Sequence, residues 1–244
     1  MTAPLFFVEA GALGSDEIVL DGAEGRHAAK VRRLRAGEQV DLADGTGALA
    51  HCLVTLAGVD ALTLTVQERT TAPAPTPSFT VVQALPKGDR GELAVEVLTE
   101  VGVDEIVPWQ AARCVTKWTG DRGERSAQRW AAHAREAAKQ ARRARVPTLA
   151  PAASTAEVSA RLSAAALAIV LHEGASDPLA TVMLPSSGEV VLVVGPEGGV
   201  DESELAAFAA AGALTSRLGP EVLRTSTAGV AALAALLART SRWA

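Results

Sequence analysis

Three short segments in the last third of the chain place glycine, proline and carboxylate residues at the ends of apolar runs. They are Leu171-His172-Glu173, Gly195-Pro196-Glu197-Gly198-Gly199 and Leu218-Gly219-Pro220-Glu221-Val222-Leu223-Arg224. Each follows a run typical of a buried strand, at residues 166–171, 190–194 and 213–218. Ligands of open α/β sheets bind at the carboxyl ends of strands. We therefore expect the three segments to form one binding pocket.

The glycine and proline pattern also indicates the kind of ligand. Neither GxGxxG nor GxxxxGK[ST], the patterns that place a phosphate at a helix N-terminus, occurs at these junctions. Proline fixes the backbone and glycine accepts positive φ, so residues 195–199 are predicted to form a rigid, tight loop with exposed backbone donors and acceptors. Such a loop suits a flat adenosine ligand without phosphate. The alternative is an ordinary turn between a strand and a helix.

The composition limits the class of protein. The chain has 244 residues, of which 48% are hydrophobic and 21% charged, as expected for a soluble globular protein with one large or two small domains. It contains no apolar run of the roughly 18 residues needed to span a bilayer, and no basic segment of a signal peptide at its start, so the cytoplasm is the expected location. Cys52 and Cys114 lack metal-ligand spacing and are predicted to be buried thiols.

The charge distribution is more informative than the net charge of −5. Residues 26–35 contain five basic residues and no acid, and residues 122–145 contain eight basic residues against two acids. Because neutralisation of phosphate drives nucleic-acid binding, these segments are predicted to contact nucleic acid. The alternative is that the second segment is the solvated face of a helix.

A proline-rich segment at residues 70–78 divides the chain into predicted domains at 1–72 and 76–244. The first has short alternating runs separated by turns, which predict a small β-barrel or open sheet. In the second, strands alternate with helices, which predicts a mostly parallel sheet covered on both faces. The expected strands are 79–85, 105–109, 166–171, 190–194 and 214–218, and the expected helices are 89–101, 124–143, 154–163, 201–211 and 225–240.

Several segments together resemble one enzyme family. They are 193–199, 218–228, Leu85-Pro86-Lys87-Gly88-Asp89-Arg90, Leu98-Thr99-Glu100-Val101-Gly102-Val103, Arg113-Cys114, Gln140 with Arg143 and Arg145-Val146-Pro147, and His27 with Val31-Arg32-Arg33-Leu34-Arg35. Over most of its length the chain resembles the 16S ribosomal RNA uridine-N3 methyltransferases of the SPOUT (trefoil-knot) superfamily. The resemblance implies an α/β fold in which a C-terminal SPOUT-type knotted parallel-sheet domain follows a small PUA-like RNA-binding β-barrel.

The resemblance also implies ligands and the residues that hold them. The cofactor is S-adenosyl-L-methionine, the partner is 16S ribosomal RNA or the assembled small subunit, and a homodimer forms through the knotted domain, without metal or membrane. Arg224 and Glu197 are the expected catalytic residues. Cofactor binding is expected at Leu171, His172, Glu173, Gly195, Pro196, Glu197, Gly198, Gly199, Leu218, Gly219, Pro220 and Leu223. RNA binding is expected at Arg26, His27, Arg32, Arg33, Lys87, Arg90, Arg113, Arg143 and Arg145.

The implied reaction moves a methyl group from a sulfonium to a pyrimidine nitrogen. Because the sulfonium is already a strong electrophile, the protein must mainly align the reacting atoms and remove the weakly acidic N3 proton. A guanidinium at Arg224 can stabilise the negative charge that spreads to uracil O2 and O4; alternatively, it caps a helix or pairs with Glu197 or Glu221. The proton acceptor stays open between Glu173, Glu197 and His172.

One departure from the family pattern lies in the last motif. Family members commonly have Leu-Arg-Thr-Glu-Thr-Ala, whereas this chain has Ser226 in place of the glutamate. A role for that glutamate is therefore not carried over. Two alternatives stay open: another acceptor, such as a ribose 2′-hydroxyl or tRNA guanine N1, and a non-catalytic RNA-binding ribosome assembly factor. A metabolite-binding α/β enzyme is a more distant alternative, and the target nucleotide stays open.

Overall fold

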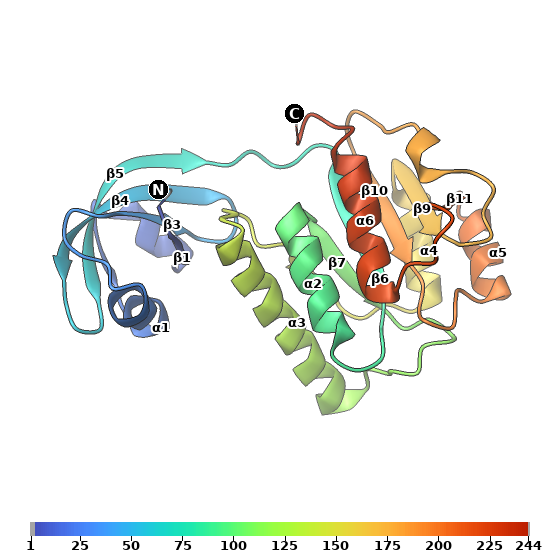
Figure 1. The fold of residues 1–244 in the computed structure, drawn as a ribbon, viewed down its shortest axis with the longest axis horizontal. Helices are drawn as coiled ribbons and strands as arrows, with labels where there is room; N and C mark the ends of the chain where they lie inside the picture. The colour runs from blue at the N-terminus through green and yellow to red at the C-terminus, as the bar shows by residue number, and fades with distance from the viewer. Residues whose placement is uncertain (1–2, 244) are drawn as a thin grey trace. The chain divides into compact units, whose positions relative to one another are not determined.

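The computed structural model describes residues 3–243, and they form two compact units (Figure 1). The first unit contains the residues up to 74 together with residues 138–146, and the second contains residues 75–137 and those from 147 onward. The sequence prediction places 138–146 in the second domain, whereas they pack with the first unit. Within the described chain, no helix is long and apolar enough to cross a membrane, and no three His, Cys, Asp or Glu side chains gather as a metal site would require.

The first unit is built on a five-stranded sheet with the order β1-β3-β4-β5-β2. Only the β1–β3 pair is parallel. Alternate residues face a core that includes Phe6, Leu42 and Leu62, as the alternating sequence pattern predicts. The elements are β1 (Leu5–Phe7), a 3-10 turn (Ala10–Gly14), β2 (Glu17–Leu20), α1 (Gly22–Arg26) continuing as a π-helical turn (His27–Val31), β3 (Gln39–Ala43), β4 (Ala48–Ala57) and β5 (Leu62–Thr71).

Residues 138–146 join the first unit through apolar packing and backbone hydrogen bonds. Ala138 lies in a buried cluster with Leu5 and Phe7 of β1. The Gly47 N–H donates to the Ala144 carbonyl at 3.2 Å. Local sequence pattern cannot predict this arrangement, because the helix that carries Ala138 continues without interruption from the second unit.

The second unit contains a six-stranded, fully parallel sheet with the order β11-β9-β10-β6-β7-β8. After Glu189, the central strand β10 is a continuous run of buried apolar residues, as expected for a sheet covered on both faces. The strands are β6 (Ser78–Ala84), β7 (Glu105–Trp109), β8 (Thr148–Leu149), β9 (Leu167–Leu171), β10 (Glu189–Val194) and β11 (Leu214–Ser216). The helices are α2 (Arg90–Val101), α3 (Gly120–Gln140), α4 (Thr155–Ala164), α5 (Glu202–Ala210) and α6 (Thr225–Leu237), with a 3-10 turn at Leu179–Thr181.

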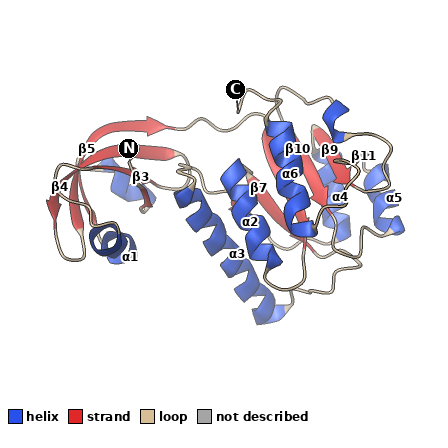
Figure 2. Cartoon of the chain, viewed as in Figure 1, coloured by secondary structure: helices blue, strands red, loops and turns tan. Residues whose placement is uncertain are grey.

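Helices cover both faces of this sheet, which confirms the prediction from the alternating pattern (Figure 2). On one face, α6 packs against α2, β6 and β10, and the buried Gln83 of β6 bonds to the start of α6. On the other face, Trp109 of β7 stacks edge-on against Phe208 of α5, with ring centroids 5.3 Å apart. Both buried faces therefore support the carboxyl ends of the strands.

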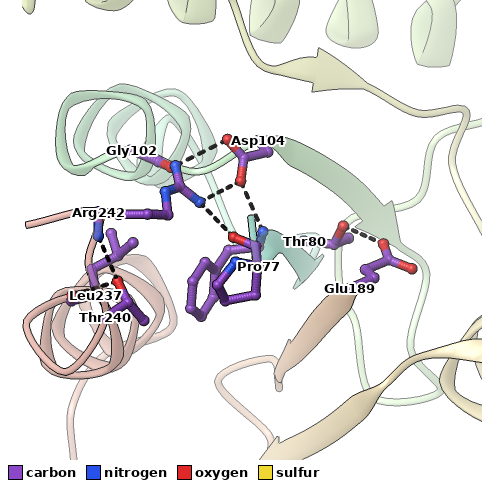
Figure 3. Close-up of polar contacts among 9 residues, drawn as sticks. Pro77, Thr80, Gly102, Asp104, Glu189, Leu237, Thr240 and Arg242 are labelled. Carbon is purple, nitrogen blue, oxygen red and sulfur yellow. Dashed lines mark hydrogen bonds and ion pairs between the residues drawn. The ribbon is translucent and has the colours of Figure 1, made fainter. Parts of the chain in front are cut away.

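The residues after α6 are bound at the amino ends of the strands of this sheet (Figure 3). The Arg242 guanidinium donates to both carboxylate oxygens of Asp104, at 2.6 and 3.1 Å. It also donates to the Gly102 and Pro77 carbonyls at 2.8 and 3.2 Å. This contact fixes the end of α6 beside the amino end of β6, so the start of α6 lies at the carboxyl ends of the strands.

Both cysteines are buried and free, which confirms their prediction as buried thiols. Burial raises the pKa of the Cys52 thiol to about 11, with a further contribution from Asp41. Burial also raises the pKa of Cys114. Both side chains are therefore protonated at neutral pH and serve as packing residues.

Candidate active site

The loops after β9, β10 and β11 line one cavity of about 970 Å³. These strands are neighbours in the order β11-β9-β10, with β6 next to β10, so four carboxyl ends meet at one edge of the sheet. The lining includes these residues predicted from the sequence: Leu171, His172, Glu173, Gly195, Pro196, Glu197, Gly198, Gly199, Leu218, Gly219, Leu223, Arg224, Lys87, Arg90 and Arg113. Pro220 is not part of the lining. The individual roles of these residues stay predictions.

The loop after β10 is tight because its backbone turns back on itself. The Gly199 N–H donates to the Pro196 carbonyl at 2.9 Å, and Gly199 has a φ of +74°, which favours glycine. A Cβ on Gly195 would lie 2.7 Å from Cγ2 of Val200. The loop therefore presents bare backbone to the cavity, as the glycine pattern predicts.

His172 is held by the backbone on either side of it. Its N–H donates to the Ser216 carbonyl at 3.0 Å, which joins the ends of β9 and β11. Its ring Nδ1 accepts the Gly174 N–H at 3.1 Å. In a neutral imidazole whose Nδ1 accepts a hydrogen bond, Nε2 carries the proton. His172 thus has no free lone pair for a substrate proton, which leaves the two glutamates as the stronger candidates.

Charged groups of both signs face the cavity. Glu197 is exposed, and its carboxylate accepts the Lys87 N–H at 3.2 Å, which connects the loops after β10 and β6. Glu173 is also exposed and has no hydrogen bond within residues 3–243. Five cations line the same space: Lys87, Arg90, Arg113, Arg217 and Arg224. This arrangement suits a polyanionic substrate approaching a pocket that also contains carboxylates.

The Arg224 guanidinium is exposed to the cavity and has no hydrogen bond or ion pair among residues 3–243. Its carbonyl, in contrast, accepts the Thr227 and Ala228 N–H groups, both at 2.9 Å, and so begins α6. The side chain does not cap the helix. Arg224 is thus the N-cap residue by position, but among residues 3–243 its guanidinium forms neither a helix-cap hydrogen bond nor an ion pair with a loop glutamate, the two alternatives predicted from the sequence.

The position of Arg224 is set by the first turn of α6. The fully buried Gln83 donates from Nε2 to the Thr225 carbonyl at 3.3 Å. Gly229 brings this turn close to the sheet, since a Cβ there would lie 3.2 Å from Cγ2 of Val194. Ser226 is 2% exposed and lies outside the cavity lining. The side chain at position 226 therefore does not face the cavity in this chain.

The remaining predicted RNA-binding residues belong to the first unit. Arg26, Arg32 and Arg33 are exposed. His27 is half-buried, and its ring meets Phe6 edge-on with centroids 5.9 Å apart, so it has a packing role as well. Arg143 and Arg145 lie in residues 138–146, beside the same sheet.

Arg145 is engaged by the protein itself. Its Nη2 donates to the Ala72 carbonyl at 2.8 Å. A Cβ on Gly47 would lie 2.5 Å from that Nη2, so the guanidinium rests directly on bare backbone. This packing stabilises the first unit, and contact of Arg145 with RNA stays a prediction.

Sequence reasoning missed several cavity residues. Arg217 is exposed and lines the cavity, although it lies outside the three predicted segments. An arginine directly after a strand carries no distinguishing signal, and Arg217 was identifiable only as a neighbour of the motif that begins at Leu218. The apolar Val194 and Ala228 resemble other core residues and become recognisable only once the strand ends are placed.

Comparisons with known proteins identify two families along the chain, which meet near residue 70. Residues 72–237 match the RNA methyltransferase domain family, and residues 20–67 match the RNA methyltransferase PUA domain family. The chain is 48% identical to ribosomal RNA small subunit methyltransferase E of Mycobacterium bovis, covering all of this chain and 94% of the relative. It is 30% identical to the protein of the same name from Bacillus subtilis, covering 89% of this chain and 88% of the relative.

A solved structure has the same fold over nearly the whole chain. It is ribosomal RNA small subunit methyltransferase E of Neisseria gonorrhoeae bound to S-adenosyl methionine, with a TM-score of 0.85, 26% sequence identity and coverage of 98% of both chains. The match thus extends across both units. On the strength of the domain matches and of full-length relatives at up to 48% identity, this chain belongs to the ribosomal RNA small subunit methyltransferase E family.

Proposed function

We propose that this enzyme transfers the methyl group of S-adenosylmethionine to N3 of a uridine in 16S ribosomal RNA. The observation that carries the proposal is the Arg224 guanidinium, which faces the cavity of the three loops without a partner among the described residues. Uracil N3 becomes a nucleophile only as its proton leaves, and negative charge then spreads to O2 and O4. A planar pair of permanently charged donors suits that charge.

The cavity residues fit S-adenosylmethionine. The volume of about 970 Å³ lies near the upper end of the range for small-molecule sites. Leu171, Leu218 and Leu223 supply apolar surface for an adenosine, and bare backbone at Gly198 supplies hydrogen-bonding groups. When bound, the cofactor supplies an activated methyl group. The relative from N. gonorrhoeae, which was solved with this cofactor, supports its assignment.

Proton transfer is assigned to a carboxylate of the cavity. Glu197 accepts one backbone N–H from Lys87 and keeps its second oxygen available. Glu173 offers an alternative base or a partner for the cofactor's ammonium group. Arg224 stabilises the anion that the base creates, so the two side chains act on the same proton transfer.

RNA recognition is assigned to basic side chains of both units. Lys87 and Arg90, which line the cavity, are assigned to the substrate. Arg26, Arg32 and Arg33, which are exposed in the first unit, are assigned to its phosphates. The non-catalytic alternative rests on Ser226, whose side chain is buried outside the cavity lining. Transfer of a methyl group to the RNA in the assay below is the result that rejects this alternative.

A homodimer and a cytoplasmic location complete the proposal. One face of α6 is buried against α2 and the sheet, whereas Val230 and Ala231 are only half-buried and Ala235 is exposed. These small apolar residues suit contact with a second copy. Sedimentation velocity should give a mass of two chains; a single-chain mass at micromolar concentration would reject the dimer.

The acceptor is tested by mapping methylated nucleosides in ribosomal RNA from cells with and without this protein. Loss of one N3-methyluridine from 16S RNA is expected. Loss of a 2′-O-methyl nucleoside, or of a methylguanosine in transfer RNA, would replace the proposed acceptor with one of the alternatives.

The role of Arg224 is tested by Arg224→Lys, which keeps the charge but removes the planar pair of donors. The single-turnover rate at saturating RNA and cofactor should fall about tenfold to a thousandfold, as for other lost transition-state donors. Cofactor affinity should change much less. Near-parental rates for both Arg224→Lys and Arg224→Ala would show that the anion is stabilised elsewhere.

A further inference from the structure

The Arg113 guanidinium bridges both ends of the turn that follows β10. Its Nη1 donates to the Gly198 carbonyl at 3.2 Å, and its Nη2 pairs with Oδ2 of Asp201 at 3.0 Å. Gly198 belongs to the cavity loop, and Asp201 is the N-cap of α5, where its side chain accepts the Ser203 N–H. One side chain from the segment after β7 therefore holds the loop and the helix that follows it.

A buried carboxylate fixes the two partners of this bridge relative to each other. Glu204 is 3% exposed. Its Oε1 accepts the Ala112 N–H at 2.8 Å, and its Oε2 accepts the Asp201 N–H at 3.1 Å. The residue before Arg113 and the residue that pairs with Arg113 are thus anchored to the same carboxyl group. The Arg113 ion pair forms in a preset geometry, which lowers its entropic cost.

The loop backbone also lies directly on the Arg113 side chain. A Cβ at Gly198 would lie 3.2 Å from Cβ of Arg113 and 3.7 Å from its Cδ. Only glycine permits this approach without displacement of one partner. Movement of Arg113 would therefore release the Gly198 carbonyl and the packing beneath it together.

We propose that Arg113 is a positioning residue for cofactor binding, which holds the loop at 195–199 in its binding conformation, and is not an RNA phosphate contact. The inference rests on the proposed function, because it takes S-adenosylmethionine as the ligand of that loop. Arg113, Asp201 and Glu204 together form a clamp that holds the loop against the start of α5. Two N–H groups of the guanidinium are used on the protein's own oxygens, and these contacts require the planar fork and not only the positive charge.

The test compares Arg113→Lys with Asp201→Asn in the full-length protein. Lysine keeps the positive charge but cannot bond both partners, and asparagine can still cap α5 but loses the ion pair. Calorimetric titration with S-adenosylmethionine alone should show affinity reduced about twofold to tenfold in each variant. The double variant should lose no more than the stronger single variant, since both changes break the same contact.

Measurement of RNA binding distinguishes a positioning role of Arg113 from a direct contact with phosphate. Affinity for a 16S RNA fragment and its salt dependence should stay parental in Arg113→Lys and in Arg113→Met. Parental cofactor affinity in Arg113→Lys, together with weaker RNA binding and a smaller salt slope in Arg113→Met, would overturn the clamp and make Arg113 a phosphate contact. If the parent protein itself failed to bind S-adenosylmethionine, the proposed function would fail first. Circular dichroism confirms folding of each variant.

Discussion

Replacing Glu204 with alanine removes a carboxylate that accepts hydrogen bonds from both the segment after β7 and the start of α5. The carboxylate accepts the Ala112 and Asp201 N–H groups and also the Thr155 hydroxyl at 2.9 Å. Alanine leaves two backbone donors without partners in a region where Glu204 itself is almost fully buried. The Thr155 hydroxyl can rotate toward another acceptor, so its loss should matter less.

The expected cost follows from the two backbone N–H groups. An unsatisfied buried donor costs about 1–3 kcal/mol, and partial access of water reduces that figure. We therefore expect Glu204→Ala to lower the free energy of unfolding of the second unit by about 3 kcal/mol, which corresponds to about 6–12 °C in its melting temperature. Glu204→Gln keeps one carbonyl oxygen and should lose about 1 kcal/mol.

Tryptophan fluorescence during urea unfolding measures the free energy of unfolding of the second unit. All four tryptophans, Trp109, Trp118, Trp130 and Trp243, belong to the second unit. Glu202→Ala is the matched control, because Glu202 is an exposed residue of the same helix turn. A free energy for Glu204→Ala within about 0.5 kcal/mol of the Glu202→Ala control would refute the argument, because such a small loss is typical of exposed sites.

Three further predictions concern the loop, pH and the first unit. Gly198→Val should reduce S-adenosylmethionine affinity at least about tenfold in calorimetry while leaving urea unfolding of the second unit within about 1 kcal/mol of the parent, because its added atoms displace Arg113 locally. Hydrogen bonds from Ser203 and the nearby Arg113 charge hold the pKa of Asp201 below its usual range. The ionised carboxylate therefore stabilises the second unit above about pH 4, and this contribution is lost as the pH falls through the lowered pKa. Asp201→Asn should make the urea midpoint of unfolding decline less steeply over that pH range. Arg142 has a φ of +56°, so Arg142→Gly should raise the stability of the first unit by about 1 kcal/mol in differential calorimetry and weaken RNA binding in a filter assay.

The elements of the second unit were predictable because their local signals agree with their environment. The apolar run of β10 can be satisfied only by burial on both faces, and the expected strand at 190–194 lies within the observed Glu189–Val194. Ser154 and Asp201 each begin a helix with a capping box, which fixed the starts of α4 and α5. The predicted meeting of three loops then followed from the rule for parallel strands, without knowledge of any contact.

The arrangement of residues 138–146 was not predictable, because it depends on a partner distant in sequence. Helical periodicity continues through Ala138, and nothing near it indicates that Leu5 and Phe7 of β1 lie alongside. The two-residue strand β8 was missed for a similar reason. Its pairing with Glu105 and Ile106 is a property of β7 and leaves no pattern in Thr148 and Leu149.

The arginines show most clearly why residue type alone could not assign roles. Arg113, Arg145 and Arg224 were all candidates for contact with substrate, and each carries five N–H donors. Arg145 donates to the Ala72 carbonyl, and its Nε is buried where no phosphate can reach it. Arg113 uses Nη1 and Nη2 on oxygens of the loop and α5. Arg224 alone of the three has no such partner among residues 3–243, so its complete set of donors remains for an anion in the cavity. A guanidinium that already donates to oxygens of its own protein serves to position other groups. A guanidinium without such partners at the strand ends is available to stabilise the negative charge of a reacting base.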